Sequence, residues 1–127
     1  MSVALDTNAY SDFMRGVASR VSVVQAASRI FLPLIVLGEL RAGFAAGNQQ
    51  LRNAETLNRF LQSHSVEVLY PDMETTKVYA DVFAQLRKQG TPIPTNDLWI
   101  AALALQHAVP LCTSDAHFEQ IAGLQVC

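Results

Sequence analysis

Short apolar segments alternate with longer segments of helical spacing along the whole chain. The short segments are rich in Val, Ile and Leu and predict strands at residues 3–5, 30–32, 66–69, 110–113 and 124–126. Helices are predicted between them, at residues 8–15, 18–28, 36–46, 49–63, 73–89, 97–107 and 116–121. Because parallel strands need crossover connections, this order predicts an α/β sandwich with a parallel sheet. An all-α fold is the alternative.

Turn and cap residues are predicted at the ends of several of these elements. Gly90 should stop the helix at 73–89, because glycine readily adopts the left-handed conformation that ends helices. Thr95 or Asn96 is expected to cap the next helix with a side-chain oxygen. Pro33 has no backbone N–H to donate, so the strand at 30–32 should end near it.

Length and charge limit the range of functions. The chain has 127 residues, half of them hydrophobic, and no linker or internal repeat divides it. We therefore expect a single domain over residues 1–127. The formal net charge of −2 argues against a protein that coats nucleic acid through bulk electrostatics. A local basic rim around an acidic site remains compatible with that charge.

The cysteines and the chain start favour a cytoplasmic protein. Cys112 and Cys127 form no CxxC pair, and the prediction is a reduced protein with two inert thiols. The first residues show neither a basic segment nor a long apolar one, so no signal peptide is predicted. The apolar runs at 30–38 and 98–105 are too short to span a bilayer, and no membrane association is expected.

Four acidic residues occupy related places in the predicted fold. Asp6 directly follows the first strand, Asp115 follows the strand at 110–113, and Glu39 lies early in the helix after the second strand. Asp97 opens the helix that follows a proline loop. Ligands of open parallel sheets bind beyond the carboxyl ends of the strands. One fold hypothesis therefore brings all four acids into one cleft, although each Asp could instead serve only as a helix cap.

Such a cluster would need a compensating charge. Two carboxylates 4 Å apart repel by about 4 kcal/mol at an effective dielectric constant of 20. A divalent cation supplies the compensation, and hard oxygen ligands suit Mg²⁺ or Mn²⁺. The hydroxyl and amide groups that flank the acids could orient them or hold water; these are Thr7, Asn8, Asn96 and Thr113. Ordinary turn chemistry is the alternative for these polar residues.

Four segments that contain the acids resemble, in order, the motifs of PIN-domain nucleases, and of VapC toxins in particular. They are residues 5–16 (LDTNAYSDFMRG), 38–40 (GEL) with Gly43, 96–102 (NDLWIAA) and 111–118 (LCTSDAHF). The resemblance covers essentially the whole chain. It implies a flavodoxin-like α/β/α sandwich with a short central parallel sheet flanked by helices.

The resemblance also implies an activity and partners. It implies an endoribonuclease that depends on Mg²⁺ or Mn²⁺. Its metal-site and catalytic acids would be Asp6, Glu39, Asp97 and Asp115, of which Asp115 would act less directly. VapC toxins are typically homodimers inhibited by a cognate VapB-type antitoxin, which would contact the helix at 36–46 and the helix after it. The expected substrate is single-stranded or loop RNA, with tRNA the leading candidate.

RNA must approach this acidic site despite the negative net charge. Arg15 and Arg41 lie close in sequence to the segments that carry the acids, and we expect them to contact phosphates. Solvated surface charge is the alternative for both.

Other protein classes fit less well. A haloacid dehalogenase-type phosphatase needs a second Asp two residues after the first, where this chain has Asn8. A receiver domain needs an acidic pair after the first strand and a Lys after the last, and both are absent. No P-loop or GxGxxG motif is present. A PIN-fold module that binds RNA or protein without catalysis is the remaining alternative.

Overall fold

A four-stranded parallel sheet forms the centre of the computed structural model, which describes residues 1–127. Its strands are β1 (Ser2–Leu5), β2 (Arg29–Pro33), β3 (Val66–Leu69) and β4 (Leu111–Cys112). The helices are α1 (Thr7–Met14), α2 (Ala18–Ala26), α3 (Leu34–Ala46), α4 (Gln50–Leu61), α5 (Met73–Gln89) and α6 (Thr95–Gln106), followed by the 3₁₀ helix η1 (Ala116–Gln120). The predicted α/β sandwich with a parallel sheet is confirmed.

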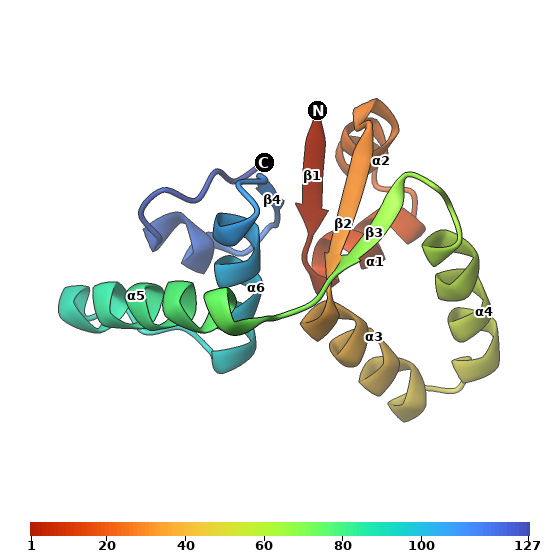
Figure 1. Ribbon diagram of the computed structural model, residues 1–127. Coiled ribbons are helices and arrows are strands. Elements are labelled where there is room, and N and C mark those ends of the chain that lie inside the picture. The colour runs from red at the N-terminus through yellow and green to blue at the C-terminus, as the bar shows by residue number, and fades with distance from the viewer.

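The strand order places the first strand inside the sheet. The order is β3-β2-β1-β4, so the chain moves outward from β1 to β3 and then crosses back to add β4 on the other side. Figure 1 shows α5 and α6, which make this crossing, on one side of β1–β3, and α3 and α4 on the other. The strand order therefore reverses between β1 and β4. Ligands of such sheets bind outside the carboxyl ends of the strands at this point.

Apolar residues on β1 and α6 build the middle of the core. Val3, Ala4 and Leu5 are fully buried, as expected for a strand covered on both faces. In α6, Leu98 and every residue from Ile100 to Ala104 are buried, so this helix is apolar nearly all round. α6 packs against α5, α3 and β2. The first turn of α6 is thereby held close to the carboxyl edge of the sheet.

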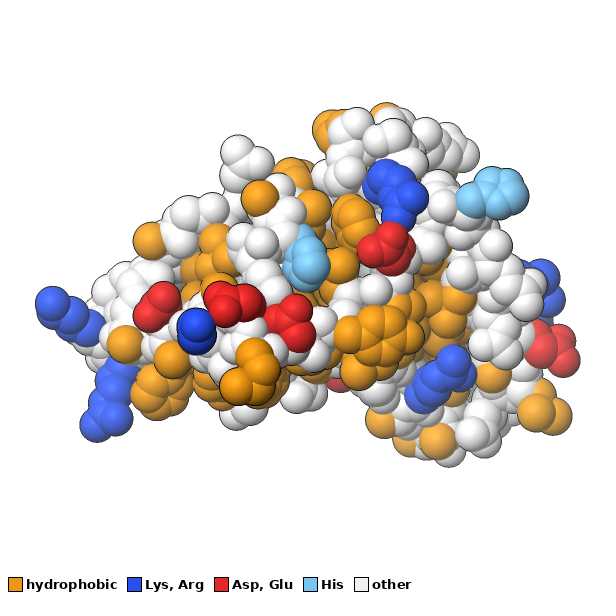
Figure 2. Space-filling model, in the orientation of Figure 1, with side chains coloured by type: hydrophobic (Ala, Val, Ile, Leu, Met, Phe, Trp, Pro, Cys, Tyr) orange, Lys and Arg blue, Asp and Glu red, His pale blue; other side chains and the backbone are white.

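Hydrophobic side chains also reach the surface. On the face shown in Figure 2, charged side chains of both signs lie over α5, with hydrophobic side chains exposed among them. Met73 and Phe83 of α5 are exposed, as is Tyr70, which directly follows β3. No helix combines the length and the apolar character that crossing a bilayer requires.

Several predicted element ends are wrong in instructive ways. The prediction that Thr95 or Asn96 caps α6 is wrong, because Pro94 occupies the cap position with an extended backbone and the helix begins at Thr95. Asp97 therefore lies in the third helical position. The predicted last strand at 124–126 is reduced to one parallel bridge between Leu111 and Val126, because β4 itself is only two residues long.

The prediction of two inert thiols is also wrong. The structure joins Cys112 and Cys127 in a disulfide with their Cα atoms 4.6 Å apart. The bridge between Leu111 and Val126 lays the C-terminal segment beside β4 and brings the two sulfur atoms together. A spacing of 15 residues in a chain without a CxxC motif does not indicate such a pair.

Candidate functional site

The four predicted acids line one cleft at the carboxyl edge of the sheet. The cleft has a volume of about 230 Å³, which is room for several water molecules at about 30 Å³ each. Its lining consists of Asp6, Thr7, Asn8, Glu39, Asp97, Ile100 and Asp115. The strand order explains this convergence, because β1 and β4 are neighbours and the two aspartates follow their carboxyl ends.

Asp6 is the most buried of the four acids. It follows β1 directly, is 5% exposed, and caps α1 by accepting a hydrogen bond from the backbone N–H of Ala9 at 2.8 Å. Burial raises the pKa of this carboxyl, while hydrogen bonds from Thr113 and Ala9 and the charge of Arg20 work in the opposite direction. Asp6 therefore both caps α1 and lines the cleft. One oxygen serves the helix, and the carboxylate still faces the other acids.

Glu39 is held in place by two neighbouring side chains. It lies on α3, half-buried, in an otherwise apolar stretch of that helix. The hydroxyl of Thr7 donates to its Oε1 at 2.6 Å, and the amide of Asn96 donates to its Oε2 at 3.4 Å. These donors come from α1 and α6, so Glu39 ties together the helices that surround the cleft. The partner that a half-buried glutamate needs is thus present.

Asp97 is the electrostatically strained member of the group. Its pKa is raised to about 6, first by burial and then by the negative charges of Asp115, Glu39 and Asp6. No hydrogen bond in the structure ends on its carboxylate. Its position in the first turn of α6 places it near the positive end of that helix, which offsets part of the cost.

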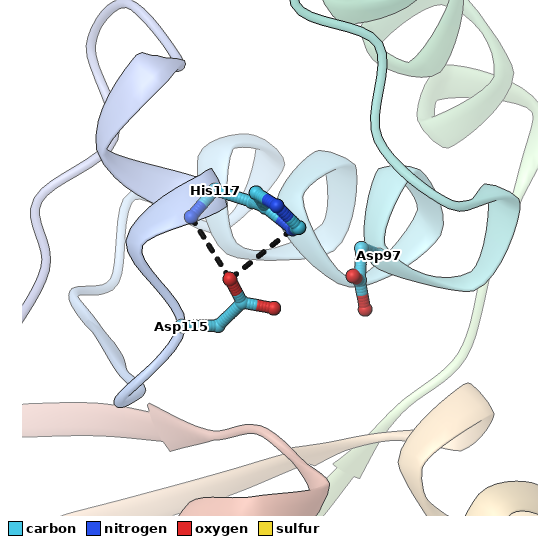
Figure 3. A group of neighbouring side chains, drawn as sticks. All are labelled: Asp97, Asp115 and His117. Atoms are coloured by element: carbon cyan, nitrogen blue, oxygen red, sulfur yellow. Dashed lines mark hydrogen bonds and ion pairs between the residues drawn. The ribbon is translucent and has the colours of Figure 1, made fainter.

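Asp115 lies at the outer rim of the cleft. It caps η1, and its Oδ1 accepts a hydrogen bond from the backbone N–H of His117 at 2.9 Å. The imidazole Nδ1 of His117 lies 3.2 Å from the same oxygen. Figure 3 shows Asp97, Asp115 and His117 pointing into one space, although they come from two separate elements. Ligand-capable atoms of these three residues all lie within 4.8 Å of one another.

Only two basic groups act on these acids. The imidazole of His117 lies beside Asp115, and the charge of Arg20 reaches Asp6. No lysine or arginine forms an ion pair with any of the four, and none lines the cleft. Oxygen donors crowded together in this way are the donor set that hard divalent cations prefer. Burial is the first cause of the raised pKa of Asp97, and the negative charges of the other acids are the second. A bound cation would relieve this second contribution. The residues therefore fit a Mg²⁺ or Mn²⁺ ion.

Three of the four predicted supporting residues contact the acids. Thr7 and Asn96 donate to Glu39, as described above. Thr113 is buried at the end of β4, and its hydroxyl accepts a hydrogen bond from the backbone N–H of Asp115 at 3.0 Å. Asn8 lines the cleft and is exposed there, without a hydrogen bond to any of the acids.

The two predicted phosphate contacts lie outside the cleft. Arg15 follows the end of α1, is exposed, and pairs with Asp12 one turn earlier. Arg41 is exposed on α3. It follows Glu39 by two residues, which places the two side chains on nearly opposite sides of that helix. Neither arginine is therefore directed at the acids.

Two further residues of the site escaped the sequence analysis. His117 lies beside Asp115, and the short spacing of an Asp cap and a His two residues later could have indicated it. Arg20 on α2 donates to the Ser114 hydroxyl at 3.0 Å and to the Cys127 carbonyl at 3.1 Å, and its charge reaches Asp6. It lies 94 residues from Ser114 along the chain, and no local pattern indicates this contact.

Comparison with known proteins identifies the family of the chain. The family model of the PIN domain matches residues 3–124. Ribonuclease VapC1 of Haemophilus influenzae (strain R2866) is 35% identical over 98% of this chain and 96% of its own length.

Solved structures extend the agreement to the fold. VapBC-1 from nontypeable Haemophilus influenzae has a TM-score of 0.84 at 31% identity and covers 100% of this chain and 97% of that one. VapBC-5 from Mycobacterium tuberculosis, a member of the VapBC family of toxin-antitoxin systems, has a TM-score of 0.74 at 26% identity, covering 98% and 95%. The chain therefore belongs to the PIN-domain family, and proteins named VapC ribonucleases are among its relatives.

Proposed function

We propose that this protein is a metal-dependent endoribonuclease toxin of the VapBC type. The observation that carries the proposal is the convergence of Asp6, Glu39, Asp97 and Asp115 in one cleft that no lysine or arginine lines. The names of the relatives support the same activity and the same type of system. The proposed substrate is single-stranded or loop RNA, with tRNA as the leading candidate.

The reaction is hydrolysis of a phosphodiester bond. Water adds to phosphorus and the bond to the 3′ oxygen breaks, which leaves 5′ phosphate and 3′ hydroxyl ends. When bound, Mg²⁺ or Mn²⁺ supplies the positive charge that draws the phosphate to the acids. Asp6 and Asp97 would hold the cation directly and Glu39 directly or through water. Asp115, at the rim, keeps its Oδ2 free to orient water, since Oδ1 already accepts from the His117 backbone.

The fixed hydrogen bonds of the site prepare these roles. Thr7 holds the Glu39 carboxylate in one orientation, and Ala9 holds Asp6. Less reorganisation is then needed when substrate and cation bind. Arg15 and Arg41 are exposed and lie outside the cleft. If they contact the RNA, they would therefore bind phosphates that flank the cleaved bond and not the cleaved phosphate. Removing either charge should make the RNA affinity depend less steeply on salt concentration. An unchanged dependence would show that the residue does not contact RNA.

We further propose that a VapB-type antitoxin binds next to the cleft. A groove of about 300 Å³ lies between α1, α3 and α4, with Tyr10, Met14 and Phe44 in its lining. Met14 is exposed there, so an apolar segment of a partner could cover it. An arginine from the same partner could pair with the acids and so block the site. A homodimer is also proposed, and exposed apolar residues such as Phe83 could contribute to its interface.

The test is RNA cleavage by the parent and by two matched variants. Asp6→Asn keeps an oxygen that can cap α1, so the variant should fold, but it should lose at least about 100-fold in cleavage rate. Asp81→Asn removes an exposed acid of α5, and its cleavage rate should equal that of the parent. Equal rates for Asp6→Asn and the parent would reject the assignment. No cleavage by the parent with either ion would favour a PIN-fold binding module.

A further inference from the structure

We propose that His117 supplies a nitrogen ligand to the cation site, so that this cleft binds Mn²⁺ in preference to Mg²⁺. The inference rests on the proposed function, because it refines the metal site of that activity. The imidazole Nδ1 lies 3.2 Å from Asp115 Oδ1, and ligand-capable atoms of His117, Asp97 and Asp115 lie within 4.8 Å of one another. Opposite ligands of an octahedral ion with bonds of 2.1 Å are about 4.2 Å apart. Only a small movement of these side chains would therefore bring all three within bonding distance of one cation.

The only contact with an acidic group that the structure gives the imidazole is the one with Asp115. The contact that caps η1 is made by the backbone N–H of His117, which any residue other than proline provides. The side chain is 62% exposed and forms no other contact with an acidic group. Figure 3 nevertheless shows the ring beside Asp115, on the side that faces Asp97. The contact with Asp115 therefore holds the ring next to the carboxylates that would bind the cation.

The type of donor determines which ion this arrangement favours. Carboxylates alone suit Mg²⁺ and Mn²⁺ alike, whereas imidazole is a ligand for transition metals. Mg²⁺ also gives up its water molecules reluctantly and gains little from a nitrogen donor. One histidine added to a carboxylate site should therefore strengthen the binding of Mn²⁺ and leave that of Mg²⁺ nearly unchanged.

The other histidines provide matched controls. His64 is exposed in the turn before β3. His107 is exposed at the far end of α6, ten residues from Asp97, which corresponds to about 15 Å along the helix. Neither can reach the cleft. A His107→Gln variant therefore loses one imidazole without changing the site.

The experiment measures metal binding in the full chain, without RNA. Metal-free protein is titrated with Mn²⁺ and with Mg²⁺ by calorimetry, and the Mn²⁺ form is examined by pulsed electron paramagnetic resonance for coupling to an imidazole nitrogen. The parent and His107→Gln should show this coupling. His117→Gln should lose it, with Mn²⁺ affinity about tenfold weaker and Mg²⁺ affinity unchanged, in the range seen when groups around a metal are removed. Because the side chain is exposed, the variant should fold like the parent.

The remaining outcomes separate this inference from the proposed function. An unchanged ratio of Mn²⁺ to Mg²⁺ affinity in His117→Gln, or coupling that persists in it, would overturn the role of His117. If Asp97→Asn lost metal binding in the same series, the proposed function would still stand. If the parent bound neither ion, both proposals would fall.

Discussion

The two sides of the acidic cleft are built differently. On the β1–α3 side, Asp6 and Glu39 accept hydrogen bonds from Ala9, Thr7 and Asn96. On the α6–η1 side, the Asp97 carboxylate accepts none, and its pKa is raised to about 6. The first side is fixed by the protein alone. The second is left with an electrostatic cost that a cation can remove, so we infer that cation binding completes a site that is already half-organised.

Stabilisation of the folded protein by the cation should be the largest effect of this difference between the two sides. A ligand that binds only the folded state at 100 times its Kd raises the free energy of unfolding by about 2.7 kcal/mol. Mg²⁺ or Mn²⁺ should therefore raise the unfolding midpoint of the parent, and a chelator should reverse the shift. The Asp97→Asn variant should lose most of the shift, whereas Asp81→Asn should keep all of it. Denaturant unfolding with and without the ion measures this, and an equal shift in Asp97→Asn would contradict the account.

A smaller effect concerns the pH dependence of the metal-free protein. The pKa of Asp97 rises from 3.8 to about 6 on folding, so between these values the folded state binds more protons than the unfolded one. The free energy of unfolding should therefore fall as the pH rises from about 4 to about 6. Asp97→Asn removes this loss and should be more stable than the parent at pH 7 by about 1–2 kcal/mol, allowing for partial solvent screening. Below about pH 4 the difference should vanish.

The measurement is urea unfolding of both proteins in a chelator across this pH range. If Asp97→Asn were less stable than the parent at pH 7, the protein itself would stabilise the charged Asp97 carboxylate. The contrast between the two sides of the cleft would then be lost.

The smallest effect concerns the fixed side. Thr7→Val keeps the shape of the side chain and removes the hydrogen bond to Glu39, which should cost about 1 kcal/mol of stability and about tenfold in cleavage rate. Thr7→Ser keeps the hydroxyl and should restore most of both. Parallel unfolding and cleavage assays measure the two quantities. If Thr7→Val cleaved RNA at the rate of the parent, the hydrogen bond to Glu39 would have no part in organising the site.

The sequence predicted the sheet and the convergence of the acids for a physical reason. Buried strands are short apolar runs, and the carboxyl ends of parallel strands share one edge, so residues that follow strands must meet. Asp6 and Asp115 were placed by this argument. Thr7 and Thr113 could be predicted too, because they lie within two residues of Asp6 and Asp115 in the chain.

Contacts between distant segments could not be predicted in this way. The pairing of Cys112 with Cys127 depends on a single bridge beside β4. The contact of Arg20 with Ser114 depends on how α2 packs. Neither contact can be recognised from nearby residues in the sequence. Hydrophobic periodicity indicates which residues are buried, but not which surfaces pack together. The cap of α6 was missed for another reason. Pro94 occupies the cap position, and no side-chain hydrogen bond caps the helix there.

The position of a bound Mn²⁺ ion would show whether the acids of the cleft hold a cation together. Crystals grown with MnCl₂ and measured near the Mn absorption edge would locate the ion by its anomalous scattering. We expect a peak in the cleft within bonding distance, about 2.2 Å, of carboxylate oxygens of Asp6 and Asp97. An occupied Mn²⁺ site elsewhere on the protein, with this cleft holding water alone, would contradict it.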